Sequence, residues 1–311
     1  MFPMVPFESL RIRLSDRYES YARWWQPSRP RGAVLYLHGI QSHGLWFEAS
    51  ARRLAEAGFA VLLPDRRGSG RNDADRGHLP SAKRLLADLS DCINEIHVRT
   101  GFTRVHIVGV SWGGKLALAL LGYLPGRVAS LTLVAPGLYP KVDLPFYQKI
   151  KVAWSIVTRS SALFPIPLQD TELFTANPGR QAFILNDSLA LHHVTSGFLR
   201  ASRRLDRIAH CAARAAEPCP LRLFLAEHDR IIDNRKTRDF VRSLDWPERD
   251  IVEYKGAHHT LEFEPDPEPF LRDLVDWIAS QPAERPLAAS LPTNDHSSTD
   301  RFHATRLENV E

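Results

Sequence analysis

The sequence predicts an α/β protein built on a mostly parallel sheet with helices on both faces. Residues 33–37 and 60–63 are continuous apolar runs, which is typical of parallel strands that are buried on both faces. Helical patterns separate such runs along the chain, and this alternation favours parallel pairing. The chain has 311 residues, of which 44% are hydrophobic, so it can bury the core of one large domain or of one domain that carries an insertion.

The predicted elements begin with a hairpin. Residues 7–14 and 18–25 are alternating runs joined by a short polar turn, a pattern that indicates two antiparallel strands. A helix is predicted from about residue 45 to residue 57, between the two continuous apolar runs, and it ends at Gly58. This part of the chain therefore forms a strand-helix-strand unit.

The clearest helix comes next and leads into a strand at residues 104–108. Its apolar residues recur with the period of one helix face: Leu85, Leu86, Leu89, Cys92, Ile93 and Ile96. A final helix has the same pattern in Phe270, Leu271, Leu274, Val275 and Ile278. Three further strands are predicted at residues 128–134, 221–225 and 250–254, so the alternation continues to the end of the folded part.

Residues 139–216 interrupt this alternation. The segment is rich in aromatic residues and proline and has no clear strand run, so we predict an inserted helical cap between core segments 1–138 and 217–280. The aromatic side chains fit either a cap over an apolar substrate or the packing of the cap itself. Residues 281–311 are polar, with few apolar residues to bury, and are predicted to form a disordered tail.

The positive charge of the chain is concentrated in the cap. The chain has 40 Lys and Arg against 36 Asp and Glu, and residues 139–216 hold ten of the former against five of the latter. This excess would favour weak peripheral association with an anionic membrane or attraction of an anionic substrate, although solvated arginines on an exposed helix explain it equally well. No base-stacking pattern accompanies the arginines, so binding to nucleic acid is not expected.

Other classes of site and location are also disfavoured. No apolar run reaches 18 residues, and the first six residues lack the charged start and apolar stretch of a secretory signal, which predicts a cytoplasmic protein. Cys92, Cys211 and Cys219 have no metal-ligand or disulfide spacing. His38 and His43 have no third ligand at a matching spacing. We therefore expect neither a metal nor an organic cofactor.

A candidate nucleophile lies between the strand at 104–108 and a helix at 115–121. The sequence GVSWGG at residues 109–114 places Ser111 at a strand-to-helix turn, where neighbouring backbone comes too close for side chains at the flanking glycines. Serine in a glycine-rich turn is often only a turn residue. Its correct placement after a buried strand favours a nucleophile, which then needs a base and an acid.

The chain supplies both partners after later strands. Asp229 follows the strand at 221–225, at the edge where ligands gather in open α/β sheets, and Asp233 is a nearby rival. The adjacent pair His258 and His259 follows the next strand. The order Ser, Asp, His is that of several serine hydrolases. The oxyanion of such a reaction needs two fixed donors, and the backbone amides of Trp112 and Ile40 are our candidates.

These motifs together resemble the α/β-hydrolases, and among them the monoacylglycerol lipase and lysophospholipase-like group. Residues 38–43 match its HGxxxH segment, residues 65–70 its DxxGxG loop and residues 109–114 its GxSxGG elbow. Asp229 occupies its acid position, and residues 256–259 match its GxxH segment. The resemblance implies that His259, which closes the GxxH segment, is the base rather than His258. Residues 65–70 are interpreted as a tight turn without a chemical role.

The predicted function is that of a serine hydrolase. Ser111, His259 and Asp229 would cleave carboxylic esters with an apolar, lipid-like acyl group through an acyl-enzyme intermediate. A peptidase or an acyltransferase that uses the same three residues is an alternative. A binding protein that has kept the fold without its activity is the other.

Overall fold

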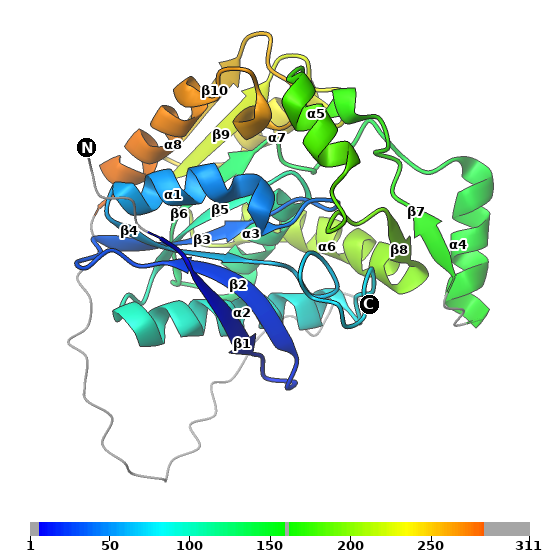
Figure 1. Ribbon diagram of the computed structural model, residues 1–311, viewed down its shortest axis with the longest axis horizontal. Helices are drawn as coiled ribbons and strands as arrows, with labels where there is room; N and C mark the ends of the chain where they lie inside the picture. The colour runs from blue at the N-terminus through cyan, green and yellow to red at the C-terminus, as the bar shows by residue number, and fades with distance from the viewer. Residues whose placement is uncertain (1–5, 159–161, 283–311) are drawn as a thin grey trace.

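The computed structural model describes residues 6–158 and 162–282. In these residues the strands form a sheet of eight strands in the order β1-β2-β4-β3-β5-β6-β9-β10 and a separate pair, β7-β8. In the part of this order that runs β4-β3-β5-β6-β9-β10, each strand is parallel to the next. The predicted α/β class with a mostly parallel sheet is thus confirmed (Figure 1).

The sheet begins with the predicted hairpin. β1 (Glu8–Arg13) pairs antiparallel with β2 (Glu19–Trp25), and β2 pairs antiparallel with β4 (Phe59–Pro64). The remaining strands are β3 (Gly32–Leu37), β5 (Val105–Val110), β6 (Val128–Val134), β9 (Leu221–Ala226) and β10 (Arg249–Tyr254). Every residue of β3, β4 and β5 is buried, which explains why these strands read as unbroken apolar runs.

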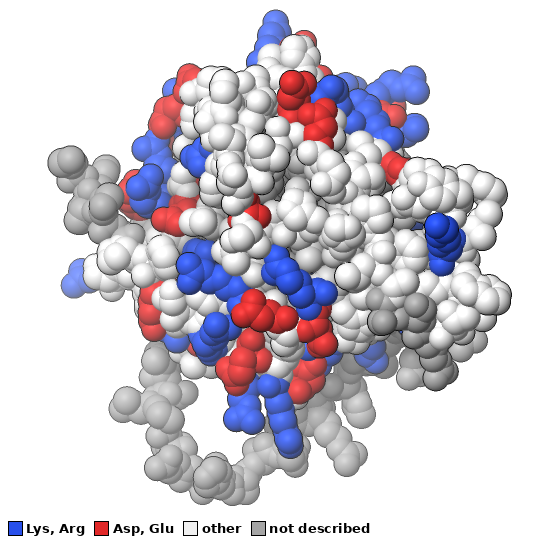
Figure 2. Space-filling view, turned by 45° about the vertical axis from the view of Figure 1, so that its right-hand side comes forward, with Lys and Arg blue, Asp and Glu red and all other residues white. Residues whose placement is uncertain are grey.

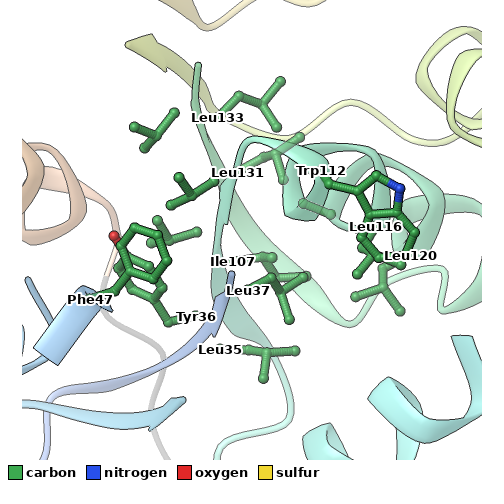
Figure 3. Packing of buried hydrophobic residues seen from close by; sticks show 14 of the residues in the cluster. Leu35, Tyr36, Leu37, Phe47, Ile107, Trp112, Leu116, Leu120, Leu131 and Leu133 are labelled. Atoms are coloured by element: carbon green, nitrogen blue, oxygen red, sulfur yellow. The ribbon is translucent and has the colours of Figure 1, made fainter. Parts of the chain in front are cut away.

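Helices cover both faces of this sheet. α1 (Glu48–Glu56), which follows the short 3-10 helix η1 (Gly44–Phe47), and α8 (Glu268–Ser280) lie together on one face. The other face carries α2 (Ala82–Thr100), α3 (Trp112–Tyr123), α6 (Ser196–Ala215) and α7 (Asn234–Ser243). Figure 3 shows the two apolar layers, with Tyr36 and Phe47 on one side of the sheet and Trp112, Leu116 and Leu120 on the other.

The clearest predicted helix is closed at both ends by its own sequence. The side chain of Ser81 accepts a hydrogen bond from the amide of Arg84 at the start of α2, and Gly101 ends the helix in the left-handed conformation. The buried residues of α2 include all six that the periodicity predicted. The hydrophobic stripe therefore determines how this helix docks on the sheet.

Residues 139–216, the predicted cap and called the cap below, are mixed rather than wholly helical. The cap contains α4 (Phe146–Thr158), α5 (Pro178–Leu185), the 3-10 helix η2 (Thr171–Leu173) and the whole of α6. It also contains the antiparallel pair β7 (Leu163–Pro165) and β8 (His193–Thr195), which the sequence analysis did not predict because each strand has three residues. α6 packs along α3, whereas α4 projects away from the rest of the fold (Figure 1).

Two further predictions concern the polar tail and the lack of a membrane-spanning segment. Residues 283–311, nearly all of the predicted tail, lie outside the described residues. Across the described ranges, no helix combines the length and apolar character needed to cross a membrane.

Candidate active site

Ser111 occupies the turn between β5 and α3. Its backbone has φ 52° and ψ −121°, a left-handed region that is costly for a residue with a side chain and occurs at strained functional turns. A Cβ added to Gly109 would lie 2.7 Å from the carbonyl oxygen of Gly113, and one added to Gly113 would lie 2.7 Å from that of His38. These glycines are therefore required by close backbone approach.

The backbone around Ser111 is held from both sides. Its amide donates to the carbonyl oxygen of Val134 at 2.9 Å, and its own carbonyl oxygen accepts from the amides of Gly114 at 2.9 Å and Gly137 at 2.7 Å. These bonds fix the strained turn against β6 and the first turn of α3. The side-chain hydroxyl makes no hydrogen bond to any group in residues 6–158 and 162–282.

Asp229 and His259 are joined directly. Nδ1 of His259 lies 2.7 Å from Oδ2 of Asp229, and both side chains are almost fully buried. The second carboxylate oxygen of Asp229 accepts hydrogen bonds from the amides of Ile231 at 2.8 Å and Ile232 at 2.9 Å. The carboxylate of Asp229 is therefore held in one orientation. It in turn orients the imidazole ring of His259 through Nδ1 and leaves Nε2 as the nitrogen not bound to Asp229.

The two rival residues lie elsewhere. His258 is partly buried and contacts other groups: its Nδ1 is 3.4 Å from Oε2 of Glu264 and its ring centroid is 5.7 Å from that of His228. The side chain of Asp233 accepts a hydrogen bond from the amide of Lys236 at 3.0 Å and caps α7. The structure thus pairs His259, and not His258, with Asp229.

Ser111, Asp229 and His259 all follow parallel strands of the same sheet. Ser111 follows β5, Asp229 comes three residues after β9, and His259 comes five residues after β10. The carboxyl ends of parallel strands meet at one edge, so all three lie at that edge. No hydrogen bond joins Ser111 to His259 among the described residues, whereas the contact between the other two is direct.

The loop after β3, which carries Ile40, passes beside Ser111. A Cβ added to Gly39 would lie 3.4 Å from the Cβ of Ser111. The amide of Gly39 donates to Oγ of Ser42 at 2.9 Å, and Leu191 of the cap donates its amide to the carbonyl oxygen of Gln41 at 2.8 Å. Trp112 is the first residue of α3, a position whose amide has no intrahelical partner.

His38 and His43 both have hydrogen-bonding partners. Nε2 of His38 accepts a hydrogen bond from the amide of Arg66 at 2.9 Å, and burial lowers the pKa of His38 well below its usual range, which keeps the ring neutral. Nε2 of His43 lies 2.9 Å from Oδ2 of Asp187 in the cap. Asp187 also accepts from Nε1 of Trp46 at 2.6 Å, so this carboxylate ties the cap to the loop.

The loop at residues 65–70 has more contacts than a simple turn. The buried carboxylate of Asp65 accepts hydrogen bonds from the amides of Gly44 at 2.7 Å and Arg71 at 2.9 Å and from the guanidinium of Arg23 at 3.2 Å. Neither these hydrogen bonds of Asp65 nor the role of Asp187 was predicted from the sequence. The second histidine of the HGxxxH segment was a signal for the latter, because a buried histidine requires a partner.

The family model described as "Serine aminopeptidase, S33" matches residues 28–266. The chain belongs to this family. It is a hydrolase by family, and the predicted α/β-hydrolase fold and the resemblance to monoacylglycerol lipases are confirmed.

Similar proteins cover most of the chain at low identity. Human monoglyceride lipase is 22% identical over 83% of this chain and 85% of its own length, and phospholipase YtpA of Bacillus subtilis is 22% identical over 78% and 93%. The crystal structure of a Paleococcus ferrophilus monoacylglycerol lipase matches with a TM-score of 0.76 at 22% identity and covers 84% of this chain and 99% of that one. At this identity the solved structure establishes the shared fold.

Proposed function

We propose that this protein is a serine hydrolase that cleaves carboxylic esters, with Ser111 as nucleophile, His259 as general base and Asp229 as its orienting acid. The observation that carries the proposal is the 2.7 Å contact between Nδ1 of His259 and Oδ2 of Asp229. Asp229 is itself anchored by two backbone amides. Such an anchored carboxylate sets the tautomer of the imidazole so that Nε2 can accept a proton.

The reaction proceeds in two steps. Nε2 of His259 removes the hydroxyl proton while Oγ of Ser111 attacks the ester carbonyl, and the tetrahedral intermediate expels the alcohol, which takes that proton from His259. Water then loses a proton to His259 and attacks the acyl-enzyme, which releases the acid and restores Ser111. In each step the amides of Ile40 and Trp112 stabilise the charged oxygen.

The decisive test replaces the nucleophile. Ser111→Ala is expected to abolish turnover of p-nitrophenyl butyrate and labelling by a fluorophosphonate probe, with an unchanged thermal unfolding midpoint. Ser243→Ala, which removes a hydroxyl bonded to the carbonyl oxygen of Phe240 at the end of α7, is the matched control and should keep full activity. A folded Ser111→Ala protein with wild-type turnover would contradict the assignment.

An unusual surface of α4 supports an apolar substrate. Phe146, Ile150, Trp154 and Val157 recur at helical spacing and are exposed, Phe146 by 78% and Trp154 by 70%. Figure 2 shows this projecting part of the molecule as largely free of charged side chains. Large apolar side chains that gather on one exposed helix face typically mark an interaction site.

We propose a lipid surface as the occupant of this face. α4 carries Lys149 and Lys151 and no acidic residue, and a helix with apolar and cationic side chains favours the boundary of an anionic lipid layer. The enzyme would then meet apolar esters where they are concentrated. This docking would add to the weak peripheral association that the basic cap favours.

A peptidase is the second candidate. The family description names an aminopeptidase, and the same triad can attack an amide carbonyl. A parallel assay of p-nitrophenyl esters, aminoacyl p-nitroanilides and acyl donors with alcohol acceptors separates esterase, peptidase and acyltransferase. Faster turnover of the anilides than of the esters would replace ester hydrolysis as the assigned reaction.

A further inference from the structure

Arg66 is a buried arginine whose guanidinium binds the loop that carries Ile40. Nη1 donates to the carbonyl oxygen of Gly39 and Nη2 to that of Ile40, each at 2.9 Å. Two parallel donors on two successive carbonyls hold a short stretch of backbone in one orientation, as a planar guanidinium does well and an ammonium does not. The loop after β3 is therefore fixed by a residue at the end of β4.

The same guanidinium lies over the aromatic ring of Trp112. Its central carbon is 4.8 Å from the centroid of Trp112 and 5.4 Å from that of Phe198 in α6, and these two rings stack with centroids 5.3 Å apart. Trp112 carries the second amide of the proposed oxyanion site. Arg66 thus contacts both segments that supply the two donors.

Arg66 forms no close ion pair with a carboxylate in the described part of the chain, although the charge of Asp65 favours its charged form. Within residues 6–158 and 162–282, no Asp or Glu oxygen lies within 4.0 Å of its guanidinium nitrogens. The adjacent Arg67, in contrast, forms ion pairs with Asp88 and Asp16, both at 2.8 Å. Burial lowers the pKa of Arg66 to about 9, while the charge of Asp65 opposes this fall, and the group remains a cation at neutral pH. A buried, unpaired cation is costly unless negative charge arises near it.

The peptide between Gly39 and Ile40 links this geometry to the reaction. In a trans peptide the N–H and C=O point in opposite directions, so holding the carbonyl of Gly39 also directs the N–H of Ile40. The carbonyl of Gly39 is held a second time by Nδ1 of His38 at 2.8 Å. A cation bound to a peptide carbonyl polarises the group and strengthens its N–H as a donor.

We propose that Arg66 is a positioning residue of the oxyanion site: it aims and polarises the amide of Ile40, braces Trp112 and supplies positive charge close to the oxygen that becomes negative. This inference rests on the proposed function. Arg66 should stabilise the transition state rather than the bound substrate, because the oxyanion exists only after Ser111 attacks.

The test uses Arg66→Met, which keeps most of the side-chain length without charge or donors, and Arg66→Lys, which keeps the charge. For p-nitrophenyl butyrate, Arg66→Met should lower kcat at least about tenfold with KM changed less than about twofold, since direct loss of an oxyanion donor costs about 10²–10³-fold. The affinity for an alkyl boronic acid, whose adduct with Ser111 is tetrahedral and anionic, should fall by a similar factor. Arg66→Lys should recover part of both.

Arg127→Gln is the matched control. Nε of Arg127 also donates to a backbone carbonyl, that of Thr103, but at the opposite end of the sheet, and the variant should keep wild-type kcat and boronate affinity. Thermal unfolding identifies any Arg66 variant that fails to fold. If Arg66→Met does not fold, the comparison of Arg66→Lys with the wild type decides, with a loss in kcat and boronate affinity expected at unchanged KM.

Three results would overturn the inference. The first is a folded Arg66→Met or Arg66→Lys protein with wild-type kcat and boronate affinity. The second is a change confined to KM. The third is a loss seen only with esters that carry an anionic acyl group, which would make Arg66 a binder of substrate charge. If Ser111→Ala is inactive in any of these cases, the proposed function stands and only the role of Arg66 fails.

Discussion

The buried carboxyl group of Glu262 accepts hydrogen bonds from both the amide and the hydroxyl of Ser50, the former at 3.0 Å. Glu262 lies in the 3-10 helix η3 (Leu261–Phe263), three residues after His259, whereas Ser50 belongs to α1. The two hydrogen bonds therefore attach the loop of the proposed base to a helix on the face of the sheet.

Glu262 should make the protein less stable as the pH rises. Burial raises the pKa of Glu262 from 4.5 to about 7, and the hydrogen bonds from Ser50 oppose that rise. The folded state then keeps a proton that the unfolded chain has lost, so the stability contribution is full below about pH 4.5 and disappears towards pH 7. Urea unfolding should show the free energy of unfolding falling by roughly 1–3 kcal/mol across this interval.

Glu262→Gln is the variant that isolates this effect, because glutamine keeps a hydrogen-bonding group of the same shape and does not titrate. Its free energy of unfolding should lack the fall between pH 4.5 and pH 7. Exposed Glu268 of α8 provides the control, and Glu268→Gln should retain the wild-type slope. Identical slopes in the wild type and Glu262→Gln would exclude Glu262 as the source.

Asp187→Ala should weaken the attachment of the cap. The change leaves the side chains of His43 and Trp46 without their acceptor, and buried donors without partners are costly. We expect a loss of roughly 2–4 kcal/mol in the free energy of unfolding and faster cleavage of the cap by trypsin. Asp143→Ala, which removes an exposed carboxylate bound to Lys149, should change stability by less than about 0.5 kcal/mol.

The carboxylate of Asp187 should also make the free energy of unfolding depend on pH in acid. Burial raises the pKa of Asp187, but the hydrogen bonds from His43 and Trp46 outweigh this and lower the pKa below 3.8. The stabilisation is then present above pH 3.8 and is lost as the pH falls through the lower folded-state value. A stability difference between wild type and Asp187→Ala that persists unchanged at pH 2 would argue against these hydrogen bonds to the Asp187 carboxylate as its source.

The two neighbouring histidines should differ sharply in kinetics. His259→Ala removes the ring bound to Asp229 and should lower kcat for p-nitrophenyl butyrate by about 10³-fold or more, while His258→Ala should cost less than about tenfold. His258 contacts Glu264 instead of Asp229, which makes it a closely matched control. A larger loss in His258→Ala would transfer the role of base to that residue.

The apolar face of α4 should be required for binding to lipid vesicles. Replacement of both Ile150 and Trp154 by Ser should reduce sedimentation with vesicles of phosphatidylcholine and phosphatidylglycerol at least about fivefold, because both side chains are exposed. Val98→Ser, which removes an equally exposed apolar side chain from α2, should leave binding unchanged. Loss of a dimer in size-exclusion chromatography, with vesicle binding intact, would assign this face to a second copy of the chain.

The central part of the fold was predictable because its strands and helices carry strong patterns. β3, β4 and β5 are buried along their whole length, and α2 has one continuous apolar stripe. α7 was missed because its sequence is dominated by charge, with Thr237, Phe240 and Val241 as its buried residues. Three buried residues in ten, two of them apolar, are too few to produce a recognisable period.

The residues of the candidate site were predictable where they belong to recognisable sequence motifs. Asp229 and His259 were selected by their positions after strands, and the structure pairs them. Arg66 and Asp187 were not predicted, because each acts on backbone or side chains that are distant in sequence. The loop at residues 65–70 was interpreted as a turn alone, since local sequence does not show that an arginine reaches the carbonyls of a neighbouring strand's loop.

The cap and the loop of His259 are bound to each other at two points, with consequences for exchanging one cap for another. The amide of Thr260 donates to the carbonyl oxygen of Phe174, and Oγ1 of Thr175 donates to that of Phe263, both at 2.8 Å. A chimaera that replaced residues 174 and 175 would also disturb the histidine beside them. The segment before α4 is excluded as well, because Nζ of Lys141 donates to the carbonyl oxygen of Asp229 at 2.7 Å. The portion open to redesign is therefore α4 itself, where new selectivity can be introduced without touching the machinery of proton transfer.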